Sequence, residues 1–165
     1  MKTIVLTGMM GCGKSTVGKI LADKLTAEHL EIDAIIETQE NSKISEIFKI
    51  KGEAYFRQLE QKIIAENFKP ENQIISLGGG AYENPQTREF LLKNSNVFYL
   101  KTSPQVIFDR IKNDTTRPLL CDNMTVENIT NILIKREKNY QSATYTIDTD
   151  NKNLEQIVNE IVGVL

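Results

Sequence analysis

The stretch G-M-M-G-C-G-K-S, residues 8–15, decides the fold, because it stands directly after a short apolar run and directly before a helical pattern. Its spacing, G-x-x-x-x-G-K-S, is typical of the loop that binds the phosphates of a nucleoside triphosphate. Glycines let successive backbone N–H groups turn toward an anion, and the following helix adds the positive end of its dipole. We therefore predict that Lys14 reaches the β- and γ-phosphates and that the Ser15 hydroxyl ligates Mg²⁺. A glycine-rich turn that binds nothing is the alternative, and the strand–loop–helix context argues against it.

The size and charge of the chain narrow the classes of protein that fit it. With 165 residues, 40% of them hydrophobic and 25% charged, it has the length and composition of one globular domain. A net charge of −2 gives no reason to expect a nucleic-acid or acidic-membrane partner. Apolar runs stay short of the roughly 20 residues of a membrane span, and the chain starts without a recognisable cleavable signal. We therefore expect a cytoplasmic protein and, as to assembly, a monomer.

Cysteine and histidine are scarce in this chain. Cys12 and Cys121 are too few for a disulfide framework or a cysteine metal cluster, and Cys12 is expected to act as a small residue of the phosphate loop. His29 is the only histidine, which argues against histidine-dependent triads and histidine-rich metal sites. Phosphoryl transfer needs neither, since it depends on positioning, Mg²⁺ and cationic donors.

Short apolar strands alternate with amphipathic helices along the chain. Strands are expected at residues 2–7, 29–32, 73–77, 96–101 and 144–147. Helices are expected at residues 14–26, 53–68, 85–93, 104–112, 125–141 and 153–164, with a shorter helical turn from residue 42 or 43 that Gly52 ends. This alternation predicts an α/β fold of three layers, α/β/α, with a five-stranded parallel sheet in a single domain of residues 1–165.

Ligands in such folds lie at the carboxyl ends of the strands. Residues 8–15, Asp33 and the glycines at 78–80 all follow predicted strands, so we expect them to meet in one cleft. Glu31 and Asp33 stand two residues apart at the end of the second strand, where strand geometry would point both the same way. One can hold a water of a Mg²⁺ shell, and the other can accept a hydroxyl proton from an acceptor substrate. A solvated acidic strand end is the alternative.

Several arginines can serve an anionic ligand. Arg57 and Glu60 lie one helical turn apart, so Glu60 can fix the guanidinium of Arg57 for a bidentate grip on a carboxylate, unless the two form only an exposed ion pair. Arg110, Arg117 and Arg136 flank a polar stretch at about 112–124. We predict that this stretch is a mobile lid that brings cations to the γ-phosphate and excludes water. Solvated surface arginines are the alternative.

Taken together, these motifs resemble those of the shikimate kinases over essentially the whole chain. The phosphate loop is followed by E-I-D at 31–33, F-R-Q-L-E at 56–60, G-G-G at 78–80 and R-P-L-L at 117–120, and Arg136 has Tyr140 four residues on. The phosphate loop alone is shared by many unrelated enzymes, whereas the later motifs in this order and spacing are far more specific. The resemblance implies an adenylate-kinase-like fold with a lid. It also implies transfer of the γ-phosphoryl group of ATP to the 3-hydroxyl of shikimate, in the route to aromatic amino acids.

The resemblance also implies a role for each matched residue. The ATP-binding set would be Gly11, Cys12, Gly13, Lys14, Ser15, Thr16, Arg110 and Arg117. The shikimate-binding set, which draws on a substrate region at about 33–61, would be Asp33, Arg57, Gly79 and Arg136. Glu60 would orient Arg57, and the catalytic residues would be Lys14, Asp33 and Arg117. Mg²⁺ would be held by Ser15 and, through water, by Glu31.

Two positions depart from the family pattern. Glu31 stands where aspartate is usual, and its extra methylene moves the carboxylate by roughly a bond length, so we expect retained activity with altered Mg²⁺ dependence. Asn41 stands where glycine is usual, and asparagine tolerates the left-handed conformation.

Three alternatives remain open at this point. A gluconate-type kinase would not need Arg57 and Arg136 to converge on a carboxylate in this pattern. A nucleoside-monophosphate kinase would need a base-reading pocket between the second and third strands. The third alternative is a regulatory relative that binds nucleotide but has lost catalytic activity, and the departure at Glu31 is the only feature that favours it.

Overall fold

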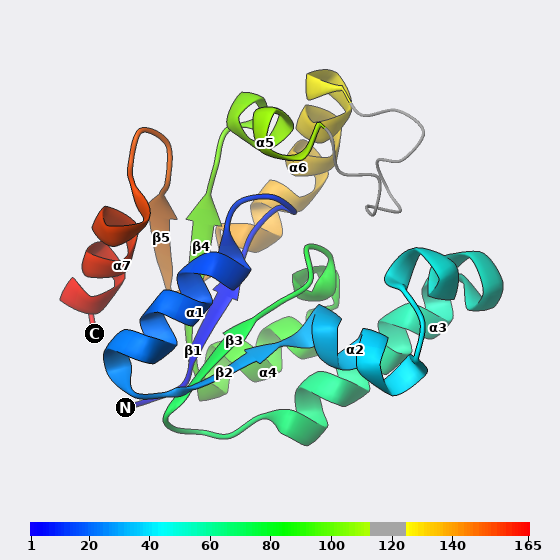
Figure 1. The fold of residues 1–165 in the computed structure, drawn as a ribbon, viewed down its shortest axis with the longest axis horizontal. Coiled ribbons are helices and arrows are strands. Elements are labelled where there is room, and N and C mark those ends of the chain that lie inside the picture. Colours follow the sequence, from blue (N-terminus) through cyan, green and yellow to red (C-terminus); the bar gives the residue numbers. More distant parts are fainter. Residues whose placement is uncertain (113–124) are drawn as a thin grey trace.

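A parallel sheet of five strands forms the centre of the molecule (Figure 1). The computed structural model describes residues 1–112 and 125–165. The strand order is β2-β3-β1-β4-β5, and in the register of the central strands Val5 lies between Ile75 and Val97. The strands are β1 (Ile4–Thr7), β2 (Glu28–Glu31), β3 (Gln73–Ser76), β4 (Asn96–Lys101) and β5 (Tyr145–Asp148). The predicted α/β fold with a five-stranded parallel sheet is confirmed.

Helices connect the strands and cover both faces of the sheet. They are α1 (Lys14–Leu25), α2 (Ile32–Glu40), α3 (Ile44–Asn67), the short 3₁₀ helix η1 (Ala81–Glu83), α4 (Pro85–Asn94), α5 (Pro104–Ile111), α6 (Val126–Tyr140) and α7 (Leu154–Gly163). Two of them begin as the sequence predicts, with a proline in the first turn. The side chains of Asn84 and Ser103 accept hydrogen bonds from backbone N–H groups of α4 and α5.

Alternate residues of the strands enter two separate hydrophobic cores, one on each face of the sheet. In β1, Ile4 and Leu6 pack with Val17 of α1 and Ile157 of α7. Val5 points the other way and packs with residues of α3, α4 and α6. Because both faces are covered, every residue of β1 is buried, as the continuous apolar run predicts.

The segment between β2 and β3 differs from the prediction. A helix, α2, follows β2 directly, although the sequence analysis expects no helix there. It ends at Asn41, whose φ of 47° is left-handed, and this agrees with the tolerance expected of asparagine. The expected break at Gly52 is present as a kink with φ 82° and ψ 166°, and the helical segments on either side of it run together as α3.

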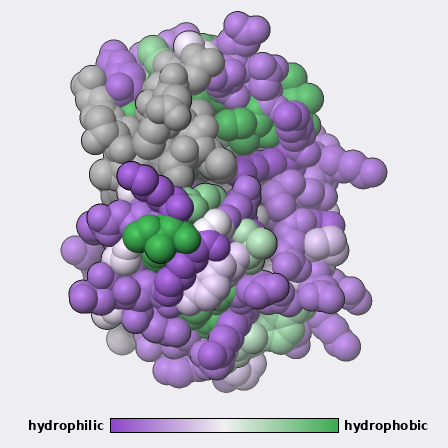
Figure 2. Space-filling model, turned by 90° about the vertical axis from the view of Figure 1, so that its right-hand side faces the viewer, coloured by the Kyte–Doolittle hydropathy of each residue, from purple (hydrophilic) through white to green (hydrophobic). Residues whose placement is uncertain are grey.

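Almost all of the predicted lid, residues 112–124, falls outside the part of the chain that the structure describes. Residues 113–124, which include Arg117 and Cys121, lie outside the described residues. The face on which α2 and α3 lie is mostly hydrophilic with scattered hydrophobic side chains (Figure 2). Within the described ranges, the helices are all too short or too polar to cross a membrane.

Candidate active site

The phosphate loop leaves the carboxyl end of β1 and enters α1 at Lys14. Gly11 and Gly13 have φ values of 76° and 101°, a region that residues with a side chain rarely adopt. A methyl group on Gly11 would also come within 2.6 Å of the Ile111 side chain. The ammonium group of Lys14 folds back over the loop and donates to the carbonyls of Gly8 and Met9 at 2.9 Å each. The lysine is therefore buried and held at the loop that it is predicted to serve.

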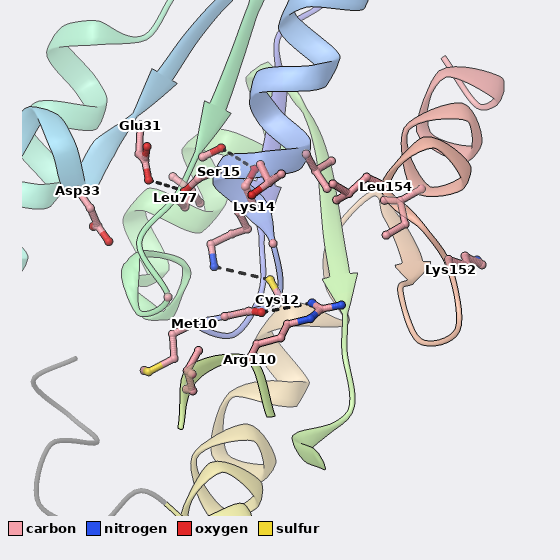
Figure 3. Close-up of a pocket in the computed structure, with 18 of the residues that line it drawn as sticks. Met10, Cys12, Lys14, Ser15, Glu31, Asp33, Leu77, Arg110, Lys152 and Leu154 are labelled. Atoms are coloured by element: carbon pink, nitrogen blue, oxygen red, sulfur yellow. Dashed lines mark hydrogen bonds between the residues drawn. The ribbon is translucent and has the colours of Figure 1, made fainter. Parts of the chain in front are cut away.

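A cleft of about 900 Å³ opens above this loop (Figure 3). Glu31 and Asp33 lie on one side of the loop, and Lys152 and Leu154 lie on the other. Gly79 also lines the cleft, and a methyl group on it would come within 3.2 Å of the Met10 backbone nitrogen. The predicted meeting of the phosphate loop, Asp33 and the glycine triplet is confirmed. The loop residues that line the cleft are Met10, Gly11, Cys12, Gly13, Lys14, Ser15 and Thr16.

Glu31 and Asp33 are not placed by one strand, as the sequence analysis assumes. Glu31 is the last residue of β2, whereas Asp33 lies in the first turn of α2. The strand geometry that would align the two carboxylates therefore stops before Asp33. The Ser15 hydroxyl donates to the Glu31 carboxylate, and both acids line the cleft (Figure 3). They therefore reach the same cleft, although from two different elements.

Ser76, which the sequence analysis does not single out, links β3 to the phosphate loop. Its hydroxyl donates to the Lys14 carbonyl at 3.1 Å, and His29 Nε2 lies 3.0 Å from the same oxygen. The hydroxyl proton points to the carbonyl, so the serine oxygen accepts from the imidazole. Burial lowers the pKa of His29, which keeps the ring neutral in this position. His29 supports the loop from the strand side.

A second, smaller pocket of about 370 Å³ adjoins the phosphate cleft. Met10, Glu31, Asp33 and Gly79 line both hollows, so the two are continuous. The pocket combines charged side chains with an aromatic and aliphatic wall, which suits a small polar ligand with an apolar ring. Its charged lining includes Asp33, Glu37, Lys43, Arg57, Glu60 and Arg136, and its apolar wall is formed by Ile44, Phe48 and Phe56.

Arg57 is held from several sides at this pocket. Its guanidinium donates to Glu60 at 2.7 Å and to Glu53 at 3.5 Å. It also lies over the Phe56 ring, 5.1 Å from the ring centroid. The contact with Glu60 is not the exposed ion pair considered as an alternative, because the Glu60 side chain is only 3% exposed. The geometry agrees with the expectation that Glu60 orients Arg57.

Glu60 also faces the other acid of the pocket. A methyl group on Gly78 would lie 2.6 Å from Asp33 Oδ1 and 2.7 Å from Glu60 Oε1, so both oxygens border this one glycine. Burial raises the pKa of Glu60 to about 7, with a further contribution from Asp33 and opposition from Arg57 and Arg136. A bulkier residue at Gly78 would displace one of the two carboxylates.

Arg136 reaches the pocket from α6. Its guanidinium donates to the Gly79 carbonyl at 2.9 Å and lies 4.0 Å from the Met9 sulfur. The residue is 9% exposed, and the same carbonyl accepts a second bond from Tyr140. The structure therefore brings together the four residues that the resemblance assigns to shikimate, from β2–α2, α3, the turn after β3, and α6.

The far end of the large cleft holds Arg110, which donates to the Gly11 carbonyl at 3.3 Å. Residues 152–155, at the end of the turn after β5 and the start of α7, complete this end and are not among the predicted site residues. The rule about carboxyl ends of strands could have found them, since they follow β5 directly. Arg117 is the one predicted site residue outside the described residues.

Comparison with known proteins places the chain in a family. A family model described as shikimate kinase matches residues 10–165. The shikimate kinase of Sulfurihydrogenibium sp. (strain YO3AOP1) is 44% identical over 162 residues, which are 98% of this chain and 96% of that protein. The structure of shikimate kinase from Acinetobacter baumannii in complex with shikimate has a TM-score of 0.95 at 33% identity, covering 99% of this chain and 92% of that one.

A gluconokinase from Sinorhizobium meliloti 1021 is more distant. It has a TM-score of 0.66 at 19% identity and covers 98% of this chain and 90% of its own, so it shares the fold alone. The sequence identity, the family model and the solved structure all lead to the same assignment. This chain belongs to the shikimate kinase family.

Proposed function

We propose that the protein transfers the γ-phosphoryl group of ATP to the 3-hydroxyl of shikimate, giving shikimate 3-phosphate and ADP. The observation that carries the proposal is a small pocket, continuous with the phosphate cleft, with Arg57 and Arg136 in its lining. A guanidinium group is planar and offers paired donors that match the two oxygens of a carboxylate. Two of them at one small pocket favour an acid as the acceptor over a neutral polyol.

The remaining residues of the pocket suit the rest of such a ligand. Phe48 and Phe56 offer an apolar wall for a six-membered ring, and Asp33 offers a carboxylate to its hydroxyls. Asp33 is our candidate to accept the proton as the hydroxyl oxygen forms its bond to the γ-phosphorus and the bond to the β-phosphate breaks. Lys14 would then stabilise the charge on the phosphoryl oxygens, with Arg117 of the predicted lid as a second cation.

The large cleft is proposed to hold the nucleotide. Backbone N–H groups of the phosphate loop and the N-terminus of α1 supply donors for the phosphates. Arg110 and the turn at 152–155 lie at the far end, in the position where the base would be expected. Water must be kept from the γ-phosphate, and we propose that role for the predicted lid.

Mg²⁺ is proposed as the cofactor, and the residues present fit it. The Ser15 hydroxyl and the Glu31 carboxylate are hard oxygen donors, and they are hydrogen-bonded to each other at the edge of the cleft. In the described part of the chain, no three Asp, Glu, His or Cys side chains gather into a metal-binding group. Such a sparse set agrees with a cation bound mainly by water and phosphate oxygens, which Ser15 and Glu31 would anchor. Mg²⁺ would neutralise charge on the triphosphate.

A parallel assay of ATP consumption with shikimate, gluconate and nucleoside monophosphates tests the proposal. We expect turnover that depends on shikimate and none above background with the other acceptors. Turnover on gluconate without turnover on shikimate would contradict the proposal. An absence of turnover with every acceptor, despite ATP binding, would favour the relative without activity.

A further inference from the structure

In the smaller pocket, which we call the acceptor pocket after its proposed ligand, the two arginines contact adjacent residues, Gly79 and Gly80. Arg136 donates to the Gly79 carbonyl oxygen at 2.9 Å. At the next residue, a methyl group on Gly80 would lie 2.7 Å from Cζ of Arg57. The two guanidinium groups therefore contact adjacent glycines that share one peptide group. Any rotation of this peptide group would change how they face a shared carboxylate.

Tyr140 fixes the orientation of this peptide. Its hydroxyl donates to the Gly79 carbonyl at 2.6 Å, so the oxygen receives two donors, one from Tyr140 and one from Arg136. A carbonyl oxygen has two lone pairs, and both are used here. Because a peptide group is planar, fixing the carbonyl also fixes the direction of the Gly80 N–H.

Tyr140 is itself held firmly. It is fully buried, and its ring stacks on Tyr99 with centroids 5.0 Å apart and an angle of 20° between the rings. Burial raises the pKa of the Tyr140 hydroxyl far above its usual range, so the hydroxyl stays protonated and remains a donor. A rigid, neutral donor on a helix is well suited to hold a loop peptide in place.

We infer that Tyr140 is a positioning residue for the acceptor: it pins the Gly79–Gly80 peptide and thereby sets the spacing of Arg57 and Arg136. This inference rests on the proposed function, since the acceptor is the acid that the two arginines are proposed to bind. Tyr140 does not itself line the pocket; it contacts the lining through its hydrogen bond to Gly79. Its loss should affect the acceptor and leave the nucleotide alone.

The structure offers a matched control in Tyr99. Both tyrosines are buried, and their rings stack on each other, but the Tyr99 hydroxyl donates to Glu137 at 2.8 Å and not to Gly79. Tyr99→Phe and Tyr140→Phe therefore remove the same atom from the same aromatic pair. Only the second change frees the Gly79 carbonyl.

Initial-rate kinetics with shikimate and with ATP, together with calorimetric titration of shikimate without nucleotide, test the inference. We expect Tyr140→Phe to raise the KM and the Kd for shikimate by about three- to tenfold, the range for one lost hydrogen bond, with the KM for ATP within about twofold. Tyr99→Phe should leave all three constants within about twofold.

Three other results would overturn the inference. Equal shifts in the two variants would reduce Tyr140 to a packing residue and overturn the inference, as would an equal rise in the KM for ATP or no shift at all. Thermal unfolding of both variants shows whether they lose similar stability. If the unaltered protein neither binds nor phosphorylates shikimate, the proposed function fails instead, and that result is visible before any variant is made.

Discussion

The phosphate loop and the acceptor pocket are built on opposite principles. Residues 8–15 form the first from one continuous stretch, and its donors are mainly backbone N–H groups. The acceptor pocket takes Asp33, Arg57, Gly79 and Arg136 from four separate segments, and its charged groups are side chains. A backbone site tolerates varied side chains between its glycines. A side-chain site depends on the neighbours that aim each group, here Glu60 for Arg57 and the Gly79 carbonyl for Arg136.

The contrast should appear first in Lys14, the cation that the phosphate loop is proposed to offer to the phosphates. Lys14→Met keeps the length of the side chain and removes the ammonium group, so kcat should fall by about 10²- to 10³-fold. Calorimetry should show little change in the Kd for shikimate, because the acceptor pocket is formed elsewhere. Lys19→Met, at an exposed position of the same helix, serves as the control and should stay near the parent. A loss of shikimate binding in Lys14→Met would show that the two regions are not separate.

The reverse experiment removes Arg57. Arg57→Ala removes the charge-assisted contact proposed for the acceptor carboxylate and takes from Glu60 its hydrogen-bond donor, so the KM for shikimate should rise by about 10- to 100-fold. The KM for ATP should stay within about twofold. Lys62→Ala removes an exposed cation from the same helix and should change neither constant. An equal loss of ATP affinity in Arg57→Ala would mean that this residue serves the nucleotide.

Glu60 is a buried carboxyl group of the acceptor pocket, and the dependence of stability on pH makes the effect of its burial measurable. Its pKa of about 7 in the folded protein exceeds the ordinary value of 4.5, so the folded state binds more protons than the unfolded state between these values. The contribution of protonated Glu60 to the free energy of unfolding is fully present below pH 4.5 and is lost as the pH rises through about 7. The free energy of unfolding should fall over this window by up to about 3 kcal/mol relative to Glu60→Gln, which stays neutral.

Urea denaturation at pH 5 and pH 8 measures this difference. Glu66→Gln, at an exposed position of the same helix, is the control and should keep the slope of the parent protein. Parallel pH profiles for the parent and Glu60→Gln would mean that Glu60 is already ionised at low pH in the folded state.

The same contrast explains which features could be predicted from the sequence. Periodicity and the phosphate-loop motif predict the sheet, because both are local patterns of adjacent residues. The helix α2 was missed, since Glu31–Ile32–Asp33 reads equally well as the end of a strand. A two-residue alternation cannot show where strand geometry stops: β2 ends at Glu31 and Asp33 already lies in α2, although both acids line the same cleft.

Local sequence patterns do not predict most contacts of the acceptor pocket, because these contacts join residues that are distant in the sequence. That Glu60 contacts Arg57 follows from their spacing on one helix, and the structure agrees. Glu60 and Asp33 also both border Gly78. This arrangement depends on how α2, α3 and the turn after β3 pack together, and a local sequence pattern does not predict such packing. Tyr140 was visible only as part of a motif, because its partner Gly79 lies 61 positions away in the chain.

Glu31 stands at the border of the two regions, and it gives the smallest expected effect. It lines both hollows and accepts a hydrogen bond from Ser15, so its carboxylate is linked to the loop and faces the acceptor side. Glu31→Asp shortens the side chain and draws the carboxylate away from Ser15. Turnover should be retained, and the Mg²⁺ concentration for half-maximal rate should change by roughly threefold, less than the 10- to 100-fold typical when an outer partner of a metal is lost.

A Mg²⁺ titration of the rate, paired with ATP binding in the absence of Mg²⁺, tests this border role. ATP binding without the metal should be unchanged, because Glu31 is proposed to act through the cation and not on the phosphates. Glu28→Asp makes the same change at the exposed start of β2 and should not alter the Mg²⁺ titration. If Glu31→Asp leaves both turnover and the Mg²⁺ titration unchanged, the carboxylate has no part in holding the metal. The bond to Ser15 would then serve only to join β2 to the loop.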